Sequence, residues 1–86
     1  MARNDMDTHR QCVNRFIALA NEMKDDGVDI HVVSASLMTA SGLYASYVAG
    51  GNQGGLTDSG VQKVAAAYKK ELARIQEIKR REVEQQ

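Results

Sequence analysis

The chain has 86 residues with 11 basic and 11 acidic side chains, so its formal net charge is zero at pH 7. Its length suits a single domain over residues 1–86, frayed at 1–6 and 84–86, whose core supplies roughly 3–5 kcal/mol. One cysteine, Cys12, excludes an internal disulfide and indicates a reducing compartment. Self-association is therefore the expected further source of stability.

Membrane insertion and export are both disfavoured by the pattern of apolar residues. The N-terminal segment MARNDMDTHRQ is polar and no apolar run follows it, so we expect no signal peptide. The least polar run, Ile30 to Ala49, is long enough to span a bilayer but contains His31, Thr39, four serines and two tyrosines. Its mean hydropathy is too low for a membrane span. We expect this run to be buried in protein, and the protein to be cytoplasmic with no membrane partner.

Apolar residues recur at three- and four-residue steps in a chain without proline, which predicts helices and not strands. The first helix is expected over about residues 7–26, with Asp5 and Asp7 where negative charge favours a helix N-terminus. Gly27 is expected to end it, because glycine readily adopts the left-handed conformation of a helix cap. The apolar series of this helix is Cys12, Val13, Phe16, Ile17, Leu19, Ala20 and Met23.

The second helix is expected over about residues 30–49, with Asp29 as its N-cap. The short connection between the first two helices predicts an antiparallel helical hairpin. No Asp, Glu, Lys or Arg lies between Ile30 and Thr57. A surface helix of a monomer carries a charged face, so we interpret this helix as a subunit interface. A half-exposed helix that happens to lack charge is the alternative. The candidate interface residues, close to one face at three- and four-residue steps, are Ser34, Leu37, Ser41, Tyr44 and Val48.

The third helix is expected over about residues 58–83, where Thr57 and Ser59 compete for the N-cap position. Glu77 lies four residues before Arg81, a spacing at which the two side chains can pair. The predicted fold class is all-α, with three helices forming an antiparallel helical hairpin plus a long C-terminal helix. The apolar series of the third helix is Val61, Val64, Ala65, Tyr68, Leu72, Ile75 and Ile78.

Three short patterns in the chain are similar to those of a known family. They are FIALAN from Phe16; the second-helix series Val33, Ala35, Leu37, Met38 and Ala40 followed by YASYVAG; and Tyr68, Lys69, Lys70 and Leu72. Over most of Arg15 to Leu72 the chain resembles a family of short, uncharacterised proteobacterial proteins, a domain of unknown function. The resemblance implies helices and no activity. The family tends to have Arg where Leu43 stands, and an acidic tail where this chain has KRREVEQQ, so roles at those places do not carry over.

Five of the seven glycines lie between Tyr47 and Gly60. A phosphate-binding Walker loop needs Gly-Lys-Ser/Thr after a strand, and here a helix precedes the loop and no lysine follows before Lys63. GNQG resembles the GxxG of KH domains, but those domains also need a sheet. The segment from Gly50 to Gly55 is therefore interpreted as a flexible connector. If it binds an anion, the free amides from Asp58 to Gly60 are the expected place.

No other constellation in the chain predicts chemistry. His9 and Cys12 lie three residues apart and His31 could join them, but a structural zinc site usually takes four ligands. Cys12 has no activating base in the sequence around it. We therefore predict no enzyme, no cofactor, and no catalytic, cofactor-binding or metal-binding residues.

Positive charge is concentrated in the third helix, where seven basic and two acidic residues lie from Lys63 to Arg81. The predicted function is a non-enzymatic, self-associating helical interaction or structural protein, a homodimer or homotetramer that acts as an adaptor or inhibitor of a larger protein partner. The alternative is a nucleic-acid-associated protein that uses the basic third helix, although glutamates interrupt its charge. The candidate residues for contact with a polyanion are Lys63, Lys70, Arg74 and Arg81.

Overall fold

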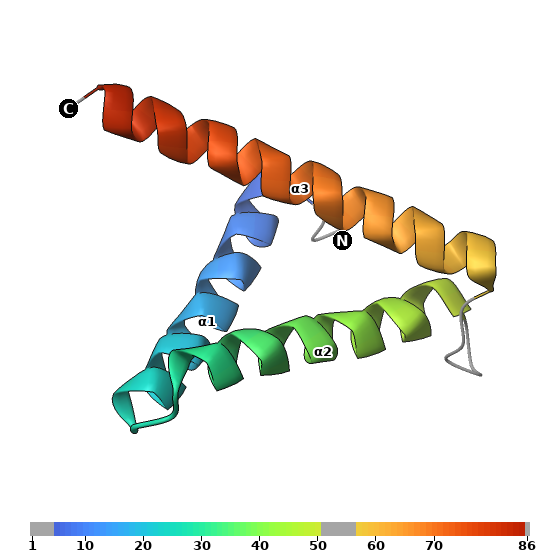
Figure 1. The fold of residues 1–86 in the computed structure, drawn as a ribbon, viewed down its shortest axis with the longest axis horizontal. Helices are drawn as coiled ribbons and strands as arrows, with labels where there is room; N and C mark the ends of the chain where they lie inside the picture. Colours follow the sequence, from blue (N-terminus) through green and yellow to red (C-terminus); the bar gives the residue numbers. More distant parts are fainter. Residues whose placement is uncertain (1–4, 51–56, 86) are drawn as a thin grey trace. The chain divides into compact units, whose positions relative to one another are not determined.

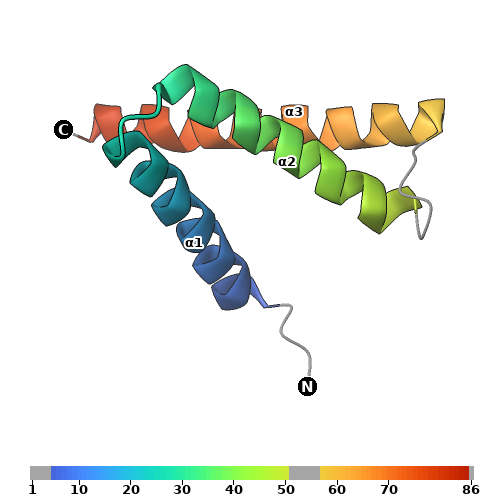
Figure 2. The ribbon, with the colours of Figure 1, turned by 90° about the horizontal axis from the view of Figure 1, so that it is seen from below.

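The computed structural model describes residues 5–50 and 57–85, and within these ranges the secondary structure consists of three α-helices and no strand (Figure 1). The helices are α1 (Met6–Asp25), α2 (Ile30–Gly50) and α3 (Asp58–Glu84). Each is continuous in both views of the ribbon (Figure 2). The all-α class and the three predicted helices are confirmed, and every helix end lies within one residue of its predicted position.

The helices are distributed over two compact units, Met1–Gly42 and Leu43–Gln86. The first unit contains α1 and most of α2, joined by a short turn as a helical hairpin. The second contains the last turns of α2 and the whole of α3.

In the first unit, α1 begins after Asp5 because the side chain of this residue caps the helix. The Thr8 amide donates to Asp5 Oδ1 at 2.7 Å, and the His9 amide donates to the Asp5 carbonyl at 3.1 Å. The bonds from Thr8 lower the pKa of Asp5, since they favour the charged carboxylate. The helix therefore starts one residue earlier than predicted, and Asp7 lies inside its first turn, where it pairs with Arg10 at 3.0 Å.

The turn between α1 and α2 depends on Gly27, as predicted. This glycine has φ +99°, a left-handed conformation that is unfavourable for residues with a Cβ. The Gly27 amide donates to the Lys24 carbonyl at 3.0 Å and the Val28 amide donates to the Met23 carbonyl at 3.1 Å, which together form a Schellman cap. Two residues later, Asp29 Oδ1 accepts the His31 amide at 2.7 Å and caps α2, which confirms its predicted role.

In the second unit, the N-terminus of α3 is capped by Thr57 and not by Ser59. Thr57 Oγ1 accepts the Gly60 amide at 3.1 Å, and the Thr57 carbonyl accepts the Val61 amide at 2.9 Å. The amide of Gly60, a candidate donor to an anion, is thus already used by the cap. Gly50 ends α2, while the rest of the predicted connector lies outside the described residues.

No side chain among residues 5–48 and 57–85 is buried. Ala20 on α1, and Val64 and Ile75 on α3, are half-buried, and they belong to the predicted apolar series of their helices. Their neighbours in the same series are more open: Phe16 is 62% exposed and Leu72 is 41% exposed. The apolar stripes are present, but these residues enclose no core within either unit. Within the units, no side chain at positions 30–48 is buried.

Candidate functional site

The candidate interface residues of α2 are all exposed to solvent. In the first unit, Ser34, Leu37 and Ser41 share one side of the helix because they are three and four residues apart. In the second unit, Tyr44 and Val48 share a side for the same reason, and they are 72% and 75% exposed. A row of small and large side chains without charge is therefore available for contact along each part of α2.

Exposed apolar side chains of α2 extend beyond that predicted face. Val32 and Met38 in the first unit are 54% and 60% exposed, and Leu43 and Tyr47 in the second are 59% and 62% exposed. These residues lie outside the candidate face that spacing defined. The signal that could have found them is the absence of charge at every position from Ile30 to Thr57, since a helix without charged residues has no strongly hydrated face to set the apolar side chains apart from.

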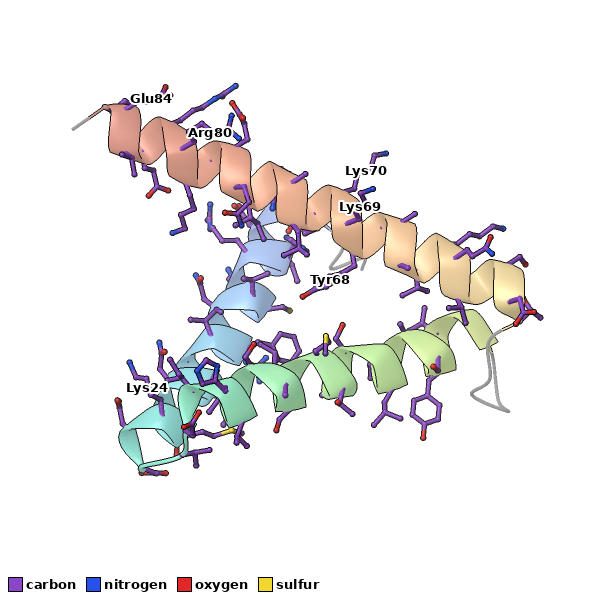
Figure 3. The ribbon with its side chains drawn as sticks, viewed as in Figure 1. Lys24, Tyr68, Lys69, Lys70, Arg80 and Glu84 are labelled. Atoms are coloured by element: carbon purple, nitrogen blue, oxygen red, sulfur yellow. The ribbon has the colours of Figure 1, made fainter. Side chains whose placement is uncertain are left out.

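The four candidate residues for a polyanion all lie exposed on α3. Steps of seven, four and seven residues place Lys63, Lys70, Arg74 and Arg81 on one side of the helix. Figure 3 shows Lys70 leaving α3 on the side opposite to Tyr68, which belongs to the apolar series. The third helix therefore separates a cationic side from an apolar side.

Two of these four cations already bind carboxylates of α3. Arg74 Nε donates to Glu71 Oε1 at 2.6 Å and Arg74 Nη2 donates to Glu71 Oε2 at 3.0 Å. This bidentate hydrogen bond, together with the negative charge of Glu71, raises the pKa of Arg74. Arg81 Nε lies 3.4 Å from Glu77 Oε1, which confirms the predicted pair, and Arg80 shares the same carboxylate at 3.3 Å. A polyanion would have to compete with these glutamates.

The described residues bring few groups together that could react or bind a metal. Within residues 5–50 and 57–85, no three or more His, Cys, Asp or Glu side chains lie close enough to hold a metal ion. The thiol of Cys12 is exposed on α1. No helix in this part of the chain is both long enough and apolar enough to cross a membrane. What the geometry offers is contact surface: the uncharged α2, and the apolar and cationic sides of α3.

The comparisons with known proteins identify a family. A family model described as a protein of unknown function (DUF3144) matches residues 10–75, or 66 of the 86 residues, and the chain belongs to this family. The match includes all five candidate interface residues but stops before Arg81. No curated protein and no solved structure matches the chain. The predicted membership of a family of unknown function is confirmed, and that family assigns no activity.

Proposed function

We propose that this protein is a non-enzymatic helical interaction protein whose copies associate as a dimer or tetramer through α2. The observation that carries the proposal is the surface of α2, which has no charged residue between Ile30 and Thr57 and exposes large apolar side chains such as Tyr44 and Val48. Large apolar side chains exposed together on one element are a feature of interaction sites in soluble proteins.

The physical argument concerns what can cover α2. Apolar surface removed from water contributes about 25 cal/mol per Å², so the exposed side chains of α2 favour any arrangement that covers them. Two other helices of the same chain can each cover one side of it. A second copy supplies an identical uncharged surface, and symmetric pairing of like surfaces is the commonest way in which soluble proteins associate.

The test is the mass of the protein in solution, measured by sedimentation at high micromolar concentration. The wild type is expected to sediment as a dimer or tetramer. Ser41→Glu places a charge on the candidate face and is expected to shift the population towards monomer, because burying an unpaired carboxylate is costly. Thr39→Glu is the matched control: it adds the same charge at an exposed position on the opposite side of α2. A monomeric wild type would overturn the proposal.

The role in the cell is proposed to be that of an adaptor or inhibitor of a larger protein, in the cytoplasm of a bacterium. The lone Cys12 suits a reducing compartment. The resemblance of the helix patterns to short proteobacterial proteins supports the bacterial origin. A pull-down from the native host, followed by identification of the bound molecules, tests the role. Recovery of the protein without any partner other than itself would favour a purely self-assembling structural role.

Nucleic-acid association through α3 is the second candidate, favoured by the placement of Lys63, Lys70, Arg74 and Arg81 on one side of the helix. Such binding depends on salt, because each neutralised phosphate releases counterions. A gel-shift titration with RNA and DNA at two salt concentrations tests it. If this candidate holds, replacing Lys63 and Lys70 with Gln weakens binding. Replacing Lys24 and Lys79 with Gln removes the same charge elsewhere and is the control.

A further inference from the structure

We propose that nucleic acid contacts only the first half of α3, where Lys63 and Lys70 bind phosphates, and that Arg74 and Arg81 in the second half bind none. The inference rests on the nucleic-acid association given above as the second candidate function, and it divides the four candidate cations into two that bind and two that do not. All four belong to α3 and therefore to one unit.

The charges of α3 differ between its two halves. Residues 59–70, the lysine half, carry three basic side chains and no acidic one, whereas residues 71–84, the arginine half, carry four basic and four acidic side chains. The lysine half is therefore cationic, and the arginine half is neutral overall. Affinity for a nucleic acid comes largely from the counterions that are released when basic side chains neutralise phosphates. Only the lysine half has net positive charge for this exchange.

Lys63 and Lys70 have no carboxylate within reach on their own helix. A helical side chain meets those three and four positions away, and for both lysines these positions hold only serine, glycine, alanine or arginine. Within residues 5–50 and 57–85, neither lysine forms an ion pair. Ala66 and Ala67 lie between them, exposed and on the same side of α3, so no bulky side chain keeps a phosphate backbone away.

Arg74 and Arg81, in contrast, each have two glutamates at helical spacing. Arg74 lies three residues from both Glu71 and Glu77, and it donates two bonds to Glu71, at 2.6 and 3.0 Å. Arg81 lies four residues after Glu77, at 3.4 Å from its carboxylate, and three before Glu84. A phosphate at either arginine would have to displace a carboxylate and then lie beside that negative charge. The glutamates therefore withhold these two arginines from a polyanion.

An anionic membrane surface fits the lysine half less well than a nucleic acid does. A helix that lies on a bilayer buries its apolar side, and its cations reach the headgroups from the flanks of that side. Figure 3 shows Lys70 leaving α3 on the side opposite to Tyr68, and Lys63 shares the side of Lys70. With the apolar side in the bilayer, both lysines would point into water.

The experiment measures the binding of the full chain to labelled duplex DNA and to labelled single-stranded RNA by gel shift over a range of salt concentrations. The slope of log affinity against log salt counts the phosphates contacted, at about −0.9 for each phosphate of duplex DNA. Replacing both Lys63 and Lys70 with Gln is expected to make the slope shallower by about 2.

The matched control replaces both Arg74 and Arg81 with Gln. It removes the same charge from the same side of α3 at the same spacing of seven residues, and it is expected to leave the slope unchanged. Glu71→Gln releases Arg74 one turn from Lys70 and is expected to make the slope steeper by about 1. This third variant gains binding, a result that a misfolded protein would not give.

The outcomes separate this inference from the candidate function on which it rests. An unchanged slope for the lysine variant, or an equal loss of slope in the lysine and arginine variants, would overturn the division of α3 and leave nucleic-acid association standing. A wild type that binds neither DNA nor RNA at low salt would overturn both. Binding to vesicles of anionic lipid but to neither nucleic acid would also overturn both, and would assign the cations to a membrane surface.

Discussion

Two glycine-to-alanine substitutions make the same chemical change with opposite expected effects. Gly27 has φ +99°, and Gly42 lies inside α2. At both positions an added Cβ would meet open space, with no atom within 4 Å other than those of the adjoining residues and, at Gly42, the nearby backbone of α2 itself. Steric crowding by neighbours therefore contributes to neither substitution. The difference between them comes only from the backbone conformation that each residue must adopt.

The magnitude follows from that conformation. An L-residue in the left-handed region costs about 1–2 kcal/mol, offset by about 0.4–1 kcal/mol because alanine restricts the unfolded chain. Gly27→Ala is thus expected to destabilise the fold by about 1 kcal/mol. Inside a helix, glycine is less favourable than alanine by about 0.8–1.0 kcal/mol, so Gly42→Ala is expected to stabilise it by about as much. The two variants should differ by about 2 kcal/mol in the free energy of unfolding.

The assay is thermal unfolding followed by circular dichroism, with all proteins at one concentration because Tm depends on concentration for any protein whose copies associate. For a chain of this size, 1 kcal/mol corresponds to about 4–8 °C, so both shifts are measurable. An unchanged or raised Tm for Gly27→Ala would refute the requirement for a left-handed residue at the turn. A lowered Tm for Gly42→Ala would show that another helix approaches α2 at Gly42 more closely than a methyl group allows.

Three further predictions concern the caps and the ion pairs. Thr57→Ala removes the acceptor for the Gly60 amide and is expected to cost about 1 kcal/mol, measured by urea unfolding, whereas Thr57→Ser keeps the hydroxyl and most of the stability. Because the pKa of Asp5 is lowered by its bonds to Thr8, its stabilising effect is present above the ordinary Asp pKa of about 3.9 and is lost as pH falls through the lowered value. Asp5→Asn keeps a capping side chain and should remove this part of the acid dependence of the helical signal; an unchanged acid profile would contradict the assignment. Arg74→Gln should leave Tm essentially unchanged, because its ion pair with Glu71 is exposed; a clear fall in Tm would contradict the exposure of this pair in solution.

Local chemistry explains why so much of the secondary structure could be predicted from the sequence. Gly27 can take the conformation that the turn requires, Asp29 can accept an amide at the start of α2, and Glu77 and Arg81 are one helical turn apart. Each of these features depends on residues within a few positions of one another. The sequence alone therefore determined three helices, their approximate ends, and the uncharged character of α2.

Other features depended on geometry that spacing does not specify. Spacing placed Asp5 and Asp7 near the start of α1 without deciding which residue caps it, and Asp5 does; Thr57 caps α3 in place of Ser59. The backbone at each helix start decides which oxygen meets a free amide. Arg74 binds Glu71 because its side chain adopts one of several possible conformations, and residue spacing does not specify which one. Only the tertiary structure decided how much of each apolar stripe is covered, since burial depends on contacts between elements. It leaves Phe16, Tyr44 and Tyr68 open to water within their units.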